Sequence, residues 1–312
     1  MKRVALLTSG GDAPGMNAAI RAATLLALHQ GVEVFGVRRG YRGLVENDLI
    51  ALKPGEVARI IREGGTILGS TRCLEFHQRE IRDRARAHLA ERGIDSLVVI
   101  GGNGSLTGMQ ALIDPNESDG QLKAIGIPAS IDNDVGVTRL AIGVDTAINT
   151  IVEACDKLSD TASAHNRAFI VEVMGRQSGY LAMTSAIASA ANAVLFPEMN
   201  RSEEEIVDVV VQAVLTASKW SDRPQRVLVI KAEGVPIGNE ALKSAVDTRL
   251  KQTFGDDRPH IETRITVLGH VVRGGRPSAL DRQIAGRLAN AAITALAAGQ
   301  TNRMAAWTPA DQ

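Results

Sequence analysis

Two aspartates lie close together in the run Ser130-Ile131-Asp132-Asn133-Asp134, just after the short apolar segment Ile125–Pro128. Proline ends a strand, and aspartates are rarely buried without a partner. At the carboxyl end of a strand in an α/β protein, such carboxylates point into the crevice where ligands bind. Taken alone, the run is equally compatible with an Asx turn that caps the next helix.

Three glycine-rich loops in the first half are candidate phosphate sites: residues 8–15, 64–72 and 101–105. Glycine lets the backbone approach a phosphate, and a following helix offers free N–H groups. Asn103 or Ser105 can reach a metal or phosphate oxygen, and Arg72 ends the second loop. The first loop matches neither the P-loop nor the dinucleotide motif and, taken singly, reads better as a tight turn. One such loop is weak evidence. Three in one chain indicate a polyphosphate ligand.

Positive side chains recur in the second half, beside glycines and strand ends: Arg167, Arg176, Arg264, His270 and Arg273. An isolated arginine is usually a solvated surface residue, but these positions suit bidentate phosphate contacts. Glu233 follows another apolar run, where it can accept a hydrogen bond from a sugar hydroxyl or cap a turn.

Strand-like and helix-like segments alternate along the chain. Apolar runs predict buried strands at 4–7, 32–37, 94–100, 122–127, 169–173 and 227–230. Helical periodicity predicts helices at 16–30, 79–92, 145–158, 180–191, 203–218 and 279–298, with a capping box at Ser202 and Glu205. This alternation predicts a doubly wound α/β fold. The polar run Asp114–Gly120 is expected to be a solvated surface loop.

Composition excludes several classes of partner. Lys+Arg and Asp+Glu are balanced at 35 each, and aromatic residues make up 3%, so we expect neither a nucleic-acid nor a membrane partner. Two cysteines form no disulfide framework, and the apolar run Val4–Leu7 is too short for a signal peptide or membrane span. We therefore expect a cytoplasmic protein.

Six segments occur together and in order: residues 8–18, 69–72, 102–105, 131–134, 172–176 and 267–275. The set resembles the bacterial ATP-dependent 6-phosphofructokinase family over nearly the whole chain. The resemblance implies phosphoryl transfer from MgATP to the 1-hydroxyl of fructose 6-phosphate, giving fructose 1,6-bisphosphate in glycolysis. It also implies two similar doubly wound lobes with mostly parallel sheets and the active site in the cleft between them. Residues 1–143 plus 272–312 would bind the nucleotide, and residues 144–271 the sugar phosphate.

The same resemblance assigns roles to single residues. Asp132 would be the general base, Asn103 and Asp134 would bind Mg²⁺, and Arg72 and Arg176 would stabilise charge on the transferred phosphoryl group. The ATP site would comprise Gly11, Tyr41, Arg72, Cys73, Gly102, Asn103, Gly104 and Ser105. The sugar phosphate would contact Ser130, Ile131, Asp132, Arg167, Met174, Gly175, Arg176, Glu233, Arg264, His270 and Arg273. Arg167 and Arg264 would come from a neighbouring subunit, so a homo-oligomer is implied, usually a tetramer.

Four positions depart from the family or decide between its members. Asn103 stands where the best-known members carry a metal-binding aspartate, so we expect weaker Mg²⁺ binding. Pyrophosphate-using relatives typically carry Asp at the position of Gly104 and Lys at that of Ala129, so ATP is the expected donor. Cys73 replaces a residue that is often aromatic; packing is the expected role, with a reactive thiol as the alternative.

The effector site of allosteric family members is expected to be degraded. Arg21 remains, but Leu25, Pro54 and Ser159 occupy other arginine positions and Asn192 replaces an acidic residue. An anionic effector that loses several charge-assisted contacts binds weakly. Little response to ADP or phosphoenolpyruvate is therefore expected. The alternative functions are a pyrophosphate-dependent phosphofructokinase, a kinase for a related sugar phosphate, and a weakly catalytic metabolite-binding subunit.

Overall fold

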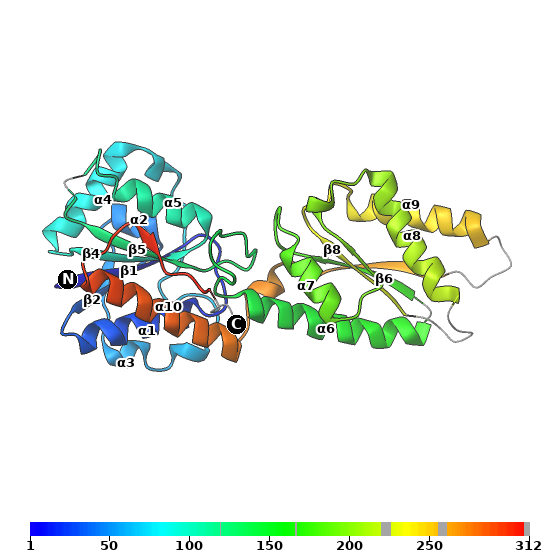
Figure 1. Cartoon of the computed structure of the whole chain (residues 1–312), viewed down its shortest axis with the longest axis horizontal. Coiled ribbons are helices and arrows are strands. Elements are labelled where there is room, and N and C mark those ends of the chain that lie inside the picture. Colours follow the sequence, from blue (N-terminus) through cyan, green and yellow to red (C-terminus); the bar gives the residue numbers. More distant parts are fainter. Residues whose placement is uncertain (119, 166, 220–225, 255–260, 309–312) are drawn as a thin grey trace. The chain divides into compact units, whose positions relative to one another are not determined.

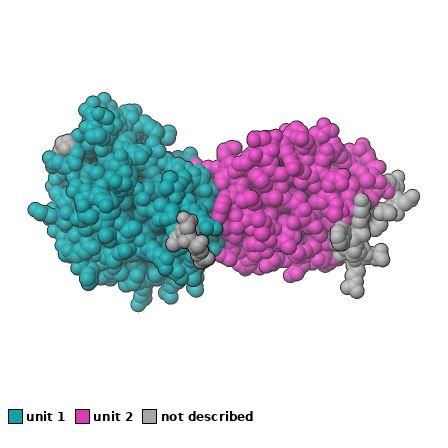
Figure 2. Space-filling model, viewed as in Figure 1, with its two compact units in different colours: residues 1–146, 273–312 teal, residues 147–272 magenta. Residues whose placement is uncertain are grey.

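The computed structural model describes residues 1–118, 120–165, 167–219, 226–254 and 261–308. The chain forms two compact units: unit 1 comprises residues 1–146 and 273–312, and unit 2 residues 147–272 (Figure 1, Figure 2). The chain passes into unit 2 within helix α6 (Val144–His165) and returns at the end of the 3₁₀-helix η4 (Gly269–Arg273).

Unit 1 contains a six-stranded sheet in the order β10-β5-β4-β1-β2-β3. Its strands are β1 (Arg3–Ser9), β2 (Glu33–Val37), β3 (Leu49–Ala51), β4 (Ser96–Gly101), β5 (Lys123–Pro128) and β10 (Arg303–Met304). Neighbouring strands are parallel except β2 and β3, and Val4 of β1 lies opposite Ser96 of β4. β4 is buried throughout and β1 and β5 nearly so, as expected for a parallel sheet covered on both faces.

Helices cover both faces of this sheet. They are α1 (Met16–His29), α2 (Tyr41–Val45), α3 (Pro54–Val57), α4 (Arg79–Glu91), α5 (Asn103–Leu112) and α10 (Ala279–Ala297), with the 3₁₀-helices η1 (Ile60–Arg62) and η2 (Leu74–His77). α1 and α10 lie side by side, whereas α4 contacts α2 and α5 (Figure 1). Leu7 packs in one core with Leu44, Leu89 and Met109 from these last three helices. Since side chains alternate along a strand, Leu6 lies on the opposite face of the sheet.

Unit 2 contains a four-stranded sheet in the order β7-β8-β6-β9, with all neighbours parallel. Its strands are β6 (Arg167–Val173), β7 (Ala193–Leu195), β8 (Val227–Ala232) and β9 (Glu262–Val267), and it also contains α7 (Tyr180–Ala188), η3 (Pro197–Met199), α8 (Glu203–Lys219) and α9 (Asn239–Phe254). Within the described ranges of both units, no helix combines the length and apolar character that a membrane crossing needs.

The predicted fold class is confirmed, and the six predicted strands correspond to β1, β2, β4, β5, β6 and β8. The predicted capping box is also confirmed. Ser202 N donates to Glu205 Oε2 at 2.8 Å, and Glu205 N donates to Ser202 Oγ at 3.3 Å. α9 and the edge strand β9 were not predicted. In β9 the exposed Glu262 and Arg264 interrupt the apolar run that marks a central strand.

The described part of the run Asp114–Gly120 is a surface loop, as expected, and one of its side chains also makes an internal contact. Asp119 lies outside the described residues, and the rest of the run includes Glu117, which accepts hydrogen bonds from the buried Arg82. The polarity of the run reflects this internal contact as well as solvent exposure.

Candidate active site

Three loops expected to carry chemistry leave the same edge of the unit 1 sheet. β1, β4 and β5 are adjacent and parallel, so residues 10–15, 102–105 and 129–134 follow their carboxyl ends side by side. The chain order reverses between β1 and β4, because β2 continues the sheet on the other side of β1. Ligands of doubly wound proteins bind at such a switch point.

Two glycines, Gly10 in the first loop and Gly101 in the third, are required by close packing. A Cβ on Gly101 would lie 2.5 Å from both Ser105 Oγ and the carbonyl oxygen of Ser9, and one on Gly10 would lie 3.2 Å from Ser105 Oγ. Gly10 also has φ 86°. The loop after β4 leads directly into α5, whose N-cap is Gly102. The first N–H groups of α5 therefore lie at the sheet edge, where they suit a phosphate.

The second glycine-rich loop is fastened to the first. Thr8 Oγ1 donates to the carbonyl oxygen of Gly69 at 3.0 Å, and Ser70 Oγ donates to that of Gly10 at 2.5 Å. These bonds bring the segment that ends in the exposed Arg72 to the edge occupied by the first loop. Arg72 therefore belongs to the same cluster of loops.

Asn17 holds the backbone of the second glycine-rich loop, a role that was not predicted from the sequence. It is 2% exposed, its Nδ2 donates to the carbonyl oxygens of Glu63 and Gly64 at 3.2 and 2.9 Å, and its Oδ1 accepts from Ile67 N at 2.8 Å. A single amide on the otherwise apolar start of α1 is the signal that could have identified it, because a buried amide needs partners.

Tyr41 supports the α5 loop from behind. It is 5% exposed, its hydroxyl donates to the carbonyl oxygen of Ser105 at 2.5 Å, and its ring stacks on Phe76 with centroids 4.2 Å apart. Burial raises the pKa of Tyr41 above its usual value.

Cys73 is partly buried and is the N-cap residue of η2. Burial is the main cause that raises the pKa of its thiol. The thiol is therefore mostly protonated near neutral pH.

The aspartate run forms a tight turn held by Asn133. Asn133 has φ 49°, its Nδ2 donates to the carbonyl oxygen of Arg139 at 3.1 Å, and its Oδ1 accepts from Ala141 N at 3.0 Å. Asparagine adopts this left-handed conformation more readily than most residues. The turn-forming role that the sequence allowed for the aspartates is therefore carried by the residue between them. Asp132 is 4% exposed, and its N–H donates to Ser130 Oγ at 3.3 Å.

Asn103 and Asp134, the two residues expected to bind Mg²⁺, lie close together. Asn103 Nδ2 donates to the backbone carbonyl of Asp134 at 3.1 Å, and both residues are exposed. Within the described part of the chain, no three His, Cys, Asp or Glu side chains gather to hold a metal ion. Ile131 is fully buried, so its side chain is not exposed to a ligand.

Arg273 lies in unit 1, against the first loop. A Cβ on Gly11 would be 2.6 Å from Arg273 Nη1, which donates to the carbonyl oxygen of Asp12 at 3.4 Å. Arg264 and His270, the residues expected to act with it, belong to unit 2.

In unit 2, Glu233 organises the turn that follows β6. Its Oε1 accepts the N–H of Gly175 at 3.2 Å and that of Arg176 at 2.7 Å. Gly175 has φ 141° and Arg176 φ 52°, and Met174 before them is 9% exposed. A Cβ on Gly234 would lie 2.1 Å from the carbonyl oxygen of Arg176. Of the two roles left open for Glu233, the turn-capping one is present in the structure.

Arg167 and Arg264 lie in the amino-terminal halves of β6 and β9, away from the turn at Met174–Arg176. Arg167 begins β6, Arg264 is the third residue of β9, and Glu262 lies opposite Arg167 in the register. Both arginines form ion pairs with Glu262. At roughly 3.3 Å per residue, the length of β6 puts Arg167 about 20 Å from the turn at Met174–Arg176.

The fold and these loops define an α/β protein of the kind that binds phosphorylated ligands at strand ends. A family model described as Phosphofructokinase matches residues 3–296. The chain belongs to the phosphofructokinase family. It is 45% identical over 306 residues to the ATP-dependent 6-phosphofructokinase of Thermotoga neapolitana, covering 98% of this chain and 90% of the relative. It is 46% identical over 301 residues to the enzyme of the same name from Macrococcus caseolyticus, covering 96% and 88%.

Solved structures agree with this fold. Phosphofructokinase from Saccharomyces cerevisiae superposes with a TM-score of 0.84 at 35% identity, and the match covers all of this chain but only 42% of that longer one. The pyrophosphate-dependent phosphofructokinase from Marinobacter aquaeolei has a TM-score of 0.82 at 22% identity, over 96% of this chain and 77% of the other. The second likeness is one of fold alone.

Proposed function

We propose that the protein is a glycolytic 6-phosphofructokinase that transfers the γ-phosphoryl group of ATP to the 1-hydroxyl of fructose 6-phosphate. The observation that carries the proposal is the meeting of Asp132, Asp134 and the Gly102–Ser105 loop at adjacent ends of β4 and β5. The names of the bacterial relatives support the same reaction.

In the nucleotide site, the backbone of the Gly102–Ser105 loop and the start of α5 would bind the phosphates. Arg72 is exposed on the fastened second loop, where a guanidinium can stabilise charge on the transferred phosphoryl group. Gly11 gives the backbone of the first loop its close approach, with Arg273 directly beside it. Tyr41 would act by holding the carbonyl of Ser105 rather than by facing solvent.

Asp132 would act as the general base. A carboxylate that accepts the proton of the 1-hydroxyl as it attacks contributes typically 10²–10⁴ in rate. Its 4% exposure limits competing contact with water, and the Asn133 turn fixes the backbone on its carboxyl side. Ser130, whose hydroxyl already contacts the N–H of Asp132, would contact the sugar.

The residues present fit a Mg²⁺ ion that is shared with a nucleotide. Magnesium is commonly bound by one or two carboxylates together with substrate phosphates and water, and not by an all-protein cage. Asp134 supplies one exposed carboxylate, and Asn103, hydrogen-bonded to its backbone, supplies an amide oxygen. The ion would neutralise charge on the phosphates during transfer. Because Asn103 brings no charge, Asp134 would provide most of the protein's attraction for it.

In unit 2, Met174, Gly175 and Arg176 would contact the sugar phosphate from the turn that Glu233 caps. His270 would bind the 6-phosphate together with Arg273. Arg167 and Arg264 would do so in a neighbouring subunit, since Arg167 lies about 20 Å along the sheet from this turn and pairs with Glu262 beside Arg264. We therefore propose a homo-oligomer, and a tetramer in particular, with active sites completed across subunits.

ATP is the proposed donor. A Cβ on Gly104 would meet no atom within 4 Å, so the position leaves room that an aspartate would fill. Ala129, 1% exposed, carries no cation for pyrophosphate. A coupled assay with fructose 6-phosphate should show turnover with ATP and much slower turnover with pyrophosphate. Faster turnover with pyrophosphate would instead favour the pyrophosphate-dependent alternative.

We also propose that the protein works in the cytoplasm and responds little to anionic effectors. Two of the positions that lack the family's effector residues, Ser159 and Asn192, make hydrogen bonds to backbone groups of their own unit. Ser159 Oγ donates to the carbonyl oxygen of Cys155 at 2.8 Å, and Asn192 exchanges hydrogen bonds with the backbone of Leu228 at 2.7 and 2.9 Å.

A further inference from the structure

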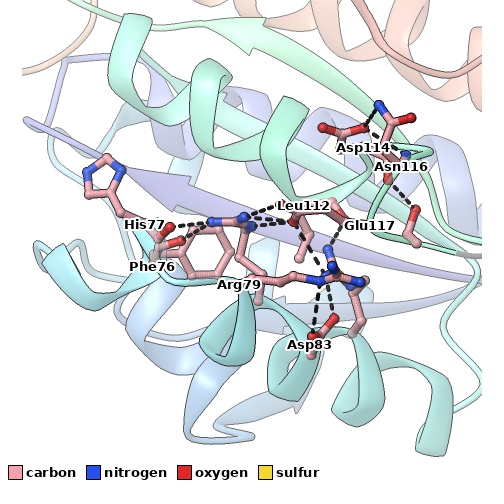
Figure 3. A network of polar contacts seen from close by, with 11 residues as sticks. Phe76, His77, Arg79, Asp83, Leu112, Asp114, Asn116 and Glu117 are labelled. Carbon is pink, nitrogen blue, oxygen red and sulfur yellow. Dashed lines mark hydrogen bonds and ion pairs between the residues drawn. The ribbon is translucent and has the colours of Figure 1, made fainter.

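Arg82 is a buried cation on α4 with its donors directed inward. It is 7% exposed, and Nε and Nη2 donate to the carboxylate of Glu117 at 3.1 and 2.7 Å. Nη1 donates to the carbonyl oxygens of Phe76 and His77 at 3.0 and 2.7 Å (Figure 3). A guanidinium that is bidentate to a carboxylate and also satisfies two carbonyls is held in one orientation.

Glu117 comes from the loop between α5 and β5, and that loop has its own internal structure. Asp114 Oδ1 accepts the N–H of Asn116 at 2.9 Å, and the carbonyl oxygen of Asp114 accepts both the N–H and the hydroxyl of Ser118 at 2.9 Å (Figure 3). Arg86 lies 3.7 Å from the same Glu117 carboxylate. The loop thus presents one acidic side chain to two arginines of α4.

The two carbonyls that Arg82 holds end η2, the short helix that starts directly after Arg72 and Cys73. Phe76 of η2 stacks on Tyr41, and Tyr41 donates to the carbonyl of Ser105 in the proposed phosphate loop. Contacts therefore run without a break from Glu117 through Arg82 and Phe76 to two parts of the proposed ATP site.

We propose that Glu117 is a positioning residue for ATP binding, acting through Arg82 on η2. The inference rests on the proposed function. Without the Glu117 carboxylate, the buried guanidinium loses its counter-charge and must seek water or another acceptor. It then releases the carbonyls of Phe76 and His77, which frees η2 and the Arg72–Cys73 segment ahead of it. The polar loop at 114–118 would therefore tune nucleotide affinity without touching the nucleotide.

The test uses Glu117→Gln in the full-length protein. The matched control is Glu80→Gln, because Glu80 is an exposed carboxylate on α4, the helix that carries Arg82. We expect the KM for ATP to rise roughly tenfold in Glu117→Gln, the loss typical of one charge-assisted hydrogen bond, with the KM for fructose 6-phosphate within twofold. The control should match the wild type. A role in stability alone would lower the Tm and leave the KM for ATP unchanged, which would overturn the proposal.

A second readout follows η2 without requiring catalysis. Iodoacetamide should label Cys73 several-fold faster in Glu117→Gln than in the wild type or the control, since Cys73 is the N-cap of η2. A raised KM with unchanged labelling would overturn the proposed route through η2. If Glu117→Gln does not fold, Glu117→Asp takes its place with the same two expectations. A wild type that neither binds nor uses ATP would overturn the proposed function, while faster labelling in the variant would still support the link from Glu117 to η2.

Discussion

Replacement of Glu233 by alanine should weaken fructose 6-phosphate binding by releasing the turn that carries Arg176. In the structure, Glu233 Oε1 accepts N–H groups from Gly175 and Arg176 at 3.2 and 2.7 Å. Arg176 has φ 52°, and a left-handed conformation costs a non-glycine residue roughly 1–2 kcal/mol. The two hydrogen bonds offset that cost, so the conformation depends on the carboxylate.

The size of the effect follows from the bonds lost. Glu233 is exposed, so each bond is worth about 1 kcal/mol, the middle of the usual range. A loss of about 2 kcal/mol corresponds to roughly a 30-fold rise in the KM for fructose 6-phosphate. Glu233→Gln keeps an amide oxygen at the same reach, and a loss of about 1 kcal/mol predicts roughly a fivefold rise.

Initial rates measured over a range of fructose 6-phosphate at saturating ATP test this order. The KM for ATP is the internal reference, and Glu240→Ala, which removes an exposed carboxylate from the first turn of α9, is the matched control. Equal KM values for Glu233→Ala and the wild type would refute the reasoning. If Glu233→Gln were as impaired as Glu233→Ala, the negative charge and not the turn cap would be the feature that matters.

Three further outcomes are expected. Asp281 is fully buried, and its carboxylate accepts hydrogen bonds from Gly143 N at 2.8 Å and from Thr146 N and Oγ1 at 2.8 and 2.5 Å. Asp281→Ala should therefore lower the free energy of unfolding by about 3 kcal/mol. An unchanged urea midpoint would contradict this. Burial raises the pKa of the Cys73 thiol, so its alkylation should be slow at pH 7 and accelerate above pH 9, whereas rapid labelling at pH 7 would indicate a reactive thiolate. Asn103→Asp adds a carboxylate beside Asp134 and should lower the Mg²⁺ concentration for half-maximal activity; an unshifted titration would show that position 103 does not bind the metal.

The central strands could be predicted because burial on both faces leaves an almost continuous apolar run, as in β4 and β8. β9 could not, because an edge strand tolerates charges such as Glu262 and Arg264 on its exposed positions. α9 has only a weak apolar face formed by Leu242, Val246 and Leu250, so its periodicity gave little signal.

The candidate site was predictable where its chemistry lies in strand-end loops, as for Asp132 and Asn103. The groups that hold those loops were not, because their role depends on contacts distant in sequence. Asn17 bonds to residues 46 to 50 positions away, and Arg82 to a carboxylate 35 positions away.

The most direct test of the proposed reaction is the rate of fructose 1,6-bisphosphate formation from ATP and fructose 6-phosphate by the wild type and by Asp132→Ser. The wild type should form ADP and fructose 1,6-bisphosphate in equal amounts. The variant should bind fructose 6-phosphate with similar affinity and turn over roughly 10²–10⁴-fold more slowly, the range expected for loss of a positioned base. Undiminished turnover in Asp132→Ser would contradict the assignment of Asp132 as the base.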